Sequence, residues 1–273
     1  MSQIDINGNR FHYIRSGSGP PIVLLHGFTG SVQTWASLQN VLENKFEVIS
    51  IDMVGHGLTD SPTQIKHYRM SSNVNDLVTL VNELGHMKAI WLGYSMGARS
   101  ALQIAIQSPS SVSGLVLEGV SPGLIDKKER SLRIQSDEKL ADDIESFGIE
   151  NFVNYWEAIP LWQTQVSLSD DVKGELHLQR LQNNPLGLAN SLRGMGTGAQ
   201  SPIEDISEIK VPVLFVCGSL DNKFCDIARK LLIELDCGEF NIVEGAGHAV
   251  HLERPDEFNA LVLKFLNKNY WDR

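Results

Sequence analysis

A serine stands between two glycines at the end of an apolar run in this sequence. Ala89-Ile90-Trp91-Leu92 leads into Gly93-Tyr94-Ser95-Met96-Gly97, and a segment with helical periodicity follows. A Gly-X-Ser-X-Gly pattern between a strand and a helix is typical of a sharp turn that presents a reactive serine hydroxyl. Gly93 and Gly97 carry no Cβ that would clash in so tight a turn. We therefore predict that Ser95 is a catalytic residue.

A serine hydroxyl needs a base to accept its proton, and a histidine oriented by a carboxylate can serve as that base. Two later loops supply the partners, Gly218-Ser219-Leu220-Asp221 and Gly245-Ala246-Gly247-His248. Each loop follows an apolar strand-like run, and loops at the carboxyl ends of parallel strands meet at one edge of a sheet. The chain order serine, acid, histidine also fits this serine turn. We predict a catalytic triad of Ser95, Asp221 and His248.

The same chemistry needs hydrogen-bond donors for a developing oxyanion. One predicted donor is the backbone N–H of Met96, the residue after the serine. The other is the N–H of Phe28, in the loop His26-Gly27-Phe28. Gly27 allows this backbone to approach a ligand closely.

These residues require a sheet to position them, and strand-like and helix-like segments alternate along the first 121 residues. Strands are predicted at 10–16, 21–26, 46–52, 89–94 and 114–118, with helices at 32–44, 70–84 and 96–107. Such alternation predicts an α/β fold with a mostly parallel, doubly wound sheet.

After residue 121 the pattern changes to helical periodicity with many charges and no convincing strand. We predict a helical cap insertion at 122–205, between a first part of the core at 1–121 and a second part at 206–273. The second part is predicted to contain strands at 211–217 and 239–243 and helices at 224–235 and 255–268.

Composition limits the partners. The formal net charge of −10 disfavours nucleic acid or an anionic membrane as the main partner. No apolar run approaches the ~20 residues of a membrane span, and the first residues show no secretion signal. Three cysteines without metal-binding spacing are typical of reduced thiols in a cytoplasmic protein, and no metal site is predicted. The sequence gives no indication of oligomeric state.

The landmarks resemble the α/β-hydrolase fold superfamily over nearly the whole chain. A closer resemblance, to the 2-succinyl-6-hydroxy-2,4-cyclohexadiene-1-carboxylate synthase (SHCHC synthase) family of menaquinone biosynthesis, lies around the serine turn and in the predicted cap. It rests on residues 93–99, on Glu118-Gly119-Val120-Ser121-Pro122-Gly123-Leu124 with the arginines that follow, and on Gln179-Arg180-Leu181-Gln182-Asn183-Asn184.

The resemblance implies a carbon–oxygen lyase that eliminates pyruvate from a cyclohexene precursor, with no cofactor. Ser95, linked to its histidine and aspartate, would then act as a base and not as an acylated nucleophile. The substrate would be a small molecule with several carboxylates. The family match further implies that Tyr94, Trp156, Arg133 and Arg180 bind this substrate.

The residues themselves also favour a polyanionic ligand. Arg99 lies four residues after Ser95, so both share one face of the predicted helix. Arg130 is three residues before Arg133, and both could share a face of a cap helix. Guanidinium groups are suited to fixing carboxylates. Arg99, Arg130 and Arg133 are therefore candidate substrate-binding residues, together with Arg180, which the resemblance implies.

Two alternatives use the same core motifs. A serine hydrolase acting on an ester or a C–C bond would need the triad but not the arginines. A non-catalytic ligand receptor on the same fold would not need all three triad residues, so the intact Ser95, Asp221 and His248 argue against it.

Overall fold

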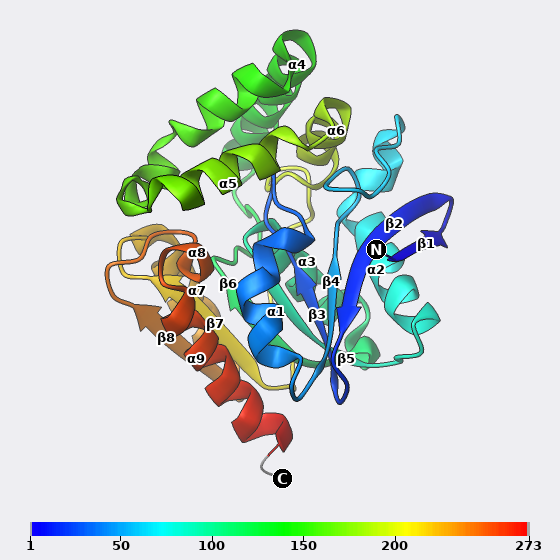
Figure 1. Ribbon diagram of the computed structural model, residues 1–273, viewed down its shortest axis with the longest axis vertical. Helices are drawn as coiled ribbons and strands as arrows, with labels where there is room; N and C mark the ends of the chain where they lie inside the picture. The colour runs from blue at the N-terminus through cyan, green and yellow to red at the C-terminus, as the bar shows by residue number, and fades with distance from the viewer. Residues whose placement is uncertain (1, 272–273) are drawn as a thin grey trace.

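The apolar runs of the sequence form one eight-stranded sheet in the computed structural model, which describes residues 2–271. The strand order is β1-β2-β4-β3-β5-β6-β7-β8 (Figure 1). β2 is antiparallel to β1 and β4, and all other neighbours are parallel. The mostly parallel sheet is thereby confirmed. The strands are β1 (Ser2–Ile6), β2 (Asn9–Ser16), β3 (Pro21–Leu25), β4 (Glu47–Ile51), β5 (Ala89–Tyr94), β6 (Val112–Glu118), β7 (Val213–Gly218) and β8 (Gly238–Val243).

Helices cover both faces of the sheet, as the alternating pattern predicts. α1 (Ala36–Leu42) and α9 (Pro255–Leu266) pack on one face. α2 (Met70–Glu83), α3 (Met96–Gln107) and α7 (Asn222–Ile233) pack on the other. β5 lies between β3 and β6, and all six of its residues are buried. The strand that leads into the serine turn is therefore held in the middle of the core.

The differences from the sequence-based prediction are local. β1 was not predicted; it is a short edge strand whose first four residues keep substantial exposure, so it has no apolar run to reveal it. The helix predicted at 32–44 begins as the 3₁₀ helix η1 (Val32–Trp35), which Ser31 caps, and continues as α1. The remaining short helices are η2 (Ile65–Tyr68), η3 (Pro109–Ser111), α8 (Val250–Glu253) and η5 (Asn267–Trp271).

The segment between β6 and β7 is helical, and residues 122–205 contain no strand. It forms α4 (Lys127–Glu157), η4 (Pro160–Ser167), α5 (Asp170–Leu181) and α6 (Pro185–Met195), which gather at one end of the sheet (Figure 1). Gly148, with φ of 82°, interrupts α4 and lets its second half change direction. Arg193 of α6 pairs with three carboxylates of α4, from Glu138, Asp142 and Glu145. The exact cap and core boundaries stay a prediction.

Two further features bear on the composition. Cys217, Cys225 and Cys237 are all free thiols. Within residues 2–271, no helix is both long enough and apolar enough to cross a membrane.

Candidate active site

The turn from β5 into α3 explains the two glycines around Ser95. Ser95 has φ of 50° and ψ of −104°, a conformation that a residue with a side chain adopts only when its surroundings impose it. A Cβ on Gly93 would lie 2.3 Å from the carbonyl carbon of Gly97, and one on Gly97 would lie 2.1 Å from the carbonyl oxygen of Leu25. Neither contact is sterically possible, so the crossing of helix and strands requires glycine at both positions.

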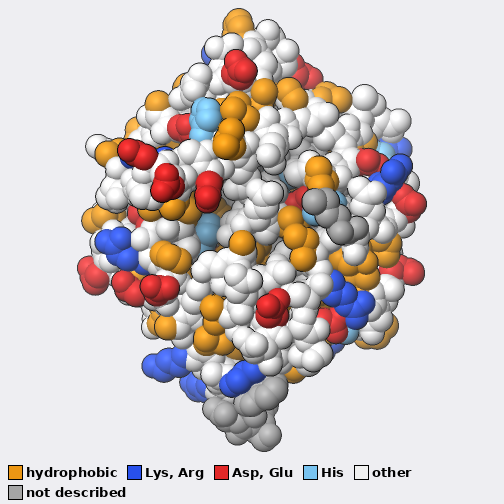
Figure 2. Space-filling model, viewed as in Figure 1, with side chains coloured by type: hydrophobic (Ala, Val, Ile, Leu, Met, Phe, Trp, Pro, Cys, Tyr) orange, Lys and Arg blue, Asp and Glu red, His pale blue; other side chains and the backbone are white. Residues whose placement is uncertain are grey.

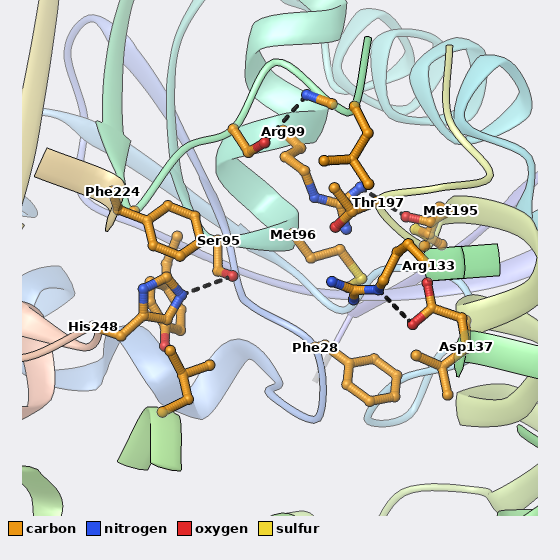
Figure 3. Close-up of a pocket in the computed structure, with 18 of the residues that line it drawn as sticks. Phe28, Ser95, Met96, Arg99, Arg133, Asp137, Met195, Thr197, Phe224 and His248 are labelled. Carbon is orange, nitrogen blue, oxygen red and sulfur yellow. Dashed lines mark hydrogen bonds and ion pairs between the residues drawn. The ribbon is translucent and has the colours of Figure 1, made fainter. Parts of the chain in front are cut away.

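The loops after β7 and β8 bring the predicted acid and histidine to this turn. His248 Nδ1 lies 2.6 Å from Asp221 Oδ2, and His248 Nε2 lies 3.1 Å from Ser95 Oγ (Figure 3). Because the carboxylate accepts from Nδ1–H, Nε2 is the nitrogen available to accept the serine proton. The structure thus brings together Ser95 and His248, which are 153 positions apart in the sequence, with Asp221 beside the histidine.

Packing fixes the imidazole in this orientation. The Phe224 ring lies 4.4 Å from the His248 ring, and Tyr94 lies 5.4 Å from it on a second side. Gly119 follows β6 with φ of 59°, and a Cβ there would come within 2.8 Å of His248 Cε1. The histidine is 3% exposed, so its hydrogen bonds to Asp221 and Ser95 are shielded from water.

A cavity of about 360 Å³ opens above Ser95, between the sheet edge and the cap. Its lining includes Ser95 and His248 and both residues predicted as oxyanion donors, Phe28 and Met96. On the face of the molecule in Figure 2, acidic side chains are spread over much of the surface. The cationic groups described next lie inside the cavity and oppose that overall negative charge.

Arg99 reaches into this cavity from α3, as the four-residue spacing from Ser95 predicts. Its Nη1 donates to the carbonyl of Met195, at 2.8 Å, and to the side-chain oxygen of Gln200. Burial lowers the pKa of Arg99 to about 10, with a smaller contribution from the nearby charge of Arg133. Within residues 2–271 no carboxylate lies within ion-pair distance of Arg99, so a ligand carboxylate would be its first direct counter-ion.

The structure separates the two neighbouring cap arginines. Arg133 lines the cavity, where its Nε donates to Asp137 Oδ1 at 2.8 Å (Figure 3). Arg130 does not line it; its Nε donates to the carbonyl of Gly198 at 2.9 Å. Arg130 is only three residues from Arg133 on α4, but its guanidinium points toward the loop after α6. Of the two, the structure favours Arg133 as the ligand-binding arginine.

Tyr94 and Trp156, the two predicted aromatic residues, both line the cavity. Tyr94 Oη and Trp156 Nε1 are buried and make no hydrogen bond to the protein. Buried polar groups ordinarily have a partner, so each of these two residues of the cavity wall retains an unused donor. Burial raises the pKa of Tyr94 well above its usual value, so its phenol stays protonated as a donor.

Arg180, the fourth predicted arginine, does not line the cavity that holds Ser95. It lines a neighbouring cavity of about 190 Å³. Its Nη1 pairs with Glu157 Oε1 at 2.9 Å, while its Nε is buried without a partner. Phe28, Tyr94 and Trp162 line both cavities, and so form the wall between them.

Among the lining residues that were not predicted from the sequence, four contribute charge or an aromatic ring: Asp137, Trp162, Lys223 and Phe224. Two of them had a signal in the sequence. Asp137 lies four residues after Arg133, the spacing of an ion pair on a helix, and Lys223 lies two residues after Asp221. Trp162 and Phe224 are aromatic residues of the kind that fill any core, so nothing local distinguishes them.

Comparison with known proteins agrees with this geometry. Residues 20–255 match the family model described as alpha/beta hydrolase fold. A Bacillus subtilis (strain 168) protein provisionally named 2-succinyl-6-hydroxy-2,4-cyclohexadiene-1-carboxylate synthase is 46% identical, over 90% of this chain and 89% of its own. An Escherichia coli O157:H7 (strain EC4115 / EHEC) protein with that synthase name is 29% identical, over 86% of this chain and 89% of its own.

Solved structures of other proteins superpose closely on this fold. MenH from S. aureus superposes with a TM-score of 0.90 at 31% identity, covering 95% of this chain and 98% of that one. A Thermogutta terrifontis esterase superposes with a TM-score of 0.88 at 21% identity, which shows the shared fold alone. The chain belongs to the α/β-hydrolase fold family and, within it, to the family of 2-succinyl-6-hydroxy-2,4-cyclohexadiene-1-carboxylate synthases.

Proposed function

We propose that this chain is a lyase of menaquinone biosynthesis. It eliminates pyruvate from 2-succinyl-5-enolpyruvyl-6-hydroxy-3-cyclohexene-1-carboxylate and forms 2-succinyl-6-hydroxy-2,4-cyclohexadiene-1-carboxylate. The observation that carries the proposal is the presence of Arg99 and Arg133 in the same cavity as the Ser95–His248 pair. A catalytic base and two fixed guanidinium groups suit proton removal from an acid with several carboxylates.

The proton path follows from the hydrogen bonds. His248 Nε2 accepts the Ser95 proton while Ser95 Oγ removes a proton from a ring carbon of the substrate. The electron pair of that C–H bond enters the new double-bond system, and the C–O bond to the enolpyruvyl group breaks. The proton held on His248 is passed to the leaving group, which is released as pyruvate. Asp221 stabilises the imidazolium between these two transfers.

The remaining site residues take binding roles in this proposal. The N–H groups of Phe28 and Met96 stabilise negative charge that develops on a substrate oxygen. Arg99 and Arg133 bind carboxylates, and Tyr94 and Trp156 donate to polar atoms of the ligand. Arg180 can contribute only across the wall that separates its cavity, or after its ion pair with Glu157 opens.

A small polyanion in the cytoplasm is the proposed partner, with no nucleic acid, membrane or metal involved. A serine hydrolase would use the same triad, so the cationic cavity is what favours the lyase. A neutral ester would leave Arg99 buried without a counter-ion, which costs binding free energy.

Incubation of the protein with the precursor tests the proposal directly. Pyruvate release, followed by coupled reduction with lactate dehydrogenase, should equal formation of the diene product. Ser95→Ala should lower kcat by roughly 10³-fold or more, because one member of a cooperating triad is removed. Turnover of p-nitrophenyl esters with rapid labelling of Ser95 by a fluorophosphonate, and no pyruvate release, would establish a hydrolase instead.

A further inference from the structure

The cavity that holds Ser95 contains a third cationic side chain that no family match suggested. The lysine and arginine residues that line this cavity are Arg99, Arg133 and Lys223. Arg180 is not among them, since it lines the neighbouring cavity. Arg99 comes from the core helix α3 and Arg133 from the cap helix α4. Lys223 comes from a third element, the first turn of α7.

Lys223 sits beside the triad. It is two residues after Asp221, and its Nζ lies 5.5 Å from the centre of the Phe224 ring. That ring in turn packs 4.4 Å from the ring of His248. Lys223 is solvent-exposed, and its contact with the aromatic face keeps the ammonium close to the ring that packs on His248.

The ammonium group of Lys223 has no counter-ion among the residues that the structure describes. Over residues 2–271, no carboxylate lies within ion-pair distance of Lys223, although the chain carries a net charge of −10. Arg133, by contrast, already pairs with Asp137. Lys223 is therefore a cation whose charge is available to a ligand.

The two arginines and Phe224, the ring that Lys223 contacts, lie on different sides of Ser95. Figure 3 shows Phe224 and His248 on one side of the serine and Arg99 and Arg133 on the other. A substrate with its reacting carbon at Ser95 therefore extends in both directions. A carboxylate on the arginine side meets the guanidinium groups, and one on the triad side meets only Lys223.

We propose that Lys223 is a specificity-determining residue that binds a substrate carboxylate on the triad side of Ser95. The inference rests on the proposed lyase function, whose precursor carries carboxylates on the ring, on the succinyl group and on the enolpyruvyl group. Three carboxylates then match three cations from three separate elements. The arrangement selects molecules with a carboxylate on either side of the reacting bond over those with carboxylates on one side only.

Lys223→Met tests this role, since methionine keeps the length of the side chain and removes its charge. Because Lys223 is exposed and water screens its charge, loss of this ion pair should raise KM for the precursor by roughly three- to fivefold. The kcat should change less than about threefold, because the triad is untouched. Lys223→Arg, which restores a cation, should recover most of the affinity.

Lys230→Met is the matched control, since Lys230 is an exposed lysine of the same helix that does not line the cavity. It should leave KM unchanged. Raising the salt concentration should also weaken wild-type binding more than that of Lys223→Met. Equal KM values for wild type and Lys223→Met would overturn the role of Lys223 while pyruvate release by the wild type still stood. Absence of pyruvate release by the wild type would instead overturn the lyase function itself.

Discussion

Arg99→Lys offers the sharpest test of the binding site, because it keeps the positive charge and removes only the guanidinium fork. In the structure one nitrogen, Nη1, is used by the carbonyl of Met195 and the side chain of Gln200. Within the described residues no acceptor bonds to Nε or Nη2. Their N–H groups are thus left to bind a substrate carboxylate with two parallel hydrogen bonds.

A lysine at this position has a single nitrogen for all of these contacts. If its ammonium keeps the bond to Met195, which lies 2.8 Å from Nη1, it cannot also present two parallel donors to the substrate. A hydrogen bond to a charged group contributes about 1.5–3 kcal/mol. At about 1.4 kcal/mol per factor of ten, loss of one such bond lowers kcat/KM roughly 10- to 100-fold.

Pyruvate release over a range of precursor concentrations measures this effect. Arg229→Lys is the matched control, because Arg229 is an exposed arginine that pairs with Asp226 and does not line the cavity. Urea denaturation of both variants separates lost binding from lost folding. A kcat/KM for Arg99→Lys within threefold of wild type would refute the assignment of Arg99 as a bidentate carboxylate ligand.

Two further predictions concern the cap and the pH range. Arg133→Ala should raise KM for the precursor several-fold with little change in kcat, since Arg133 lines the cavity away from the triad; unchanged KM in the pyruvate assay would contradict this role. Burial lowers the pKa of His26, and lowers that of His56 to about 3, so both stay neutral in the folded protein. As pH falls below about 6.5 the unfolded chain binds protons that the folded chain does not, so each histidine should cost about 1.4 kcal/mol of unfolding free energy per pH unit until the folded pKa is reached. Urea denaturation at pH 7, 6 and 5 measures the slope, and a His56→Gln variant should show a shallower one.

The sheet and the triad could be predicted from the sequence because their signals are local. The strand of Ser95 is a continuous apolar run, and two glycines mark the turn that follows it. Asp221 and His248 each follow another such run, and parallel strands bring their ends together without further information. The edge strand β1 lacks an apolar run because one side of it has no neighbour, and it was missed for that reason.

The charged lining of the cavity depends on contacts that the sequence does not display. Arg130 and Arg133 belong to one helix, and only the position of α4 over the sheet decides which of them faces the cavity. Arg180 carries the same motif evidence as Arg133. Trp162, which lies under its guanidinium at 5.6 Å, helps to form the wall that places Arg180 in a different cavity. Such placements follow from tertiary packing and not from spacing along the chain.

The charges around Ser95 also explain how one triad can serve two kinds of reaction. The 3.1 Å contact between Ser95 and His248 activates the hydroxyl equally for attack on a carbonyl and for removal of a proton. The residues that orient the ligand determine which ligand atom contacts the Ser95 hydroxyl. Arg99 is 8% exposed and has no carboxylate partner among the described residues, so a ligand that leaves it unpaired is disfavoured. A polyanionic ligand forms an ion pair with Arg99 and is thereby held in one orientation. The spacing of the ligand's carboxylates then determines which of its atoms lies at Ser95. A change from lyase to hydrolase on this fold therefore requires new cavity residues more than a new triad.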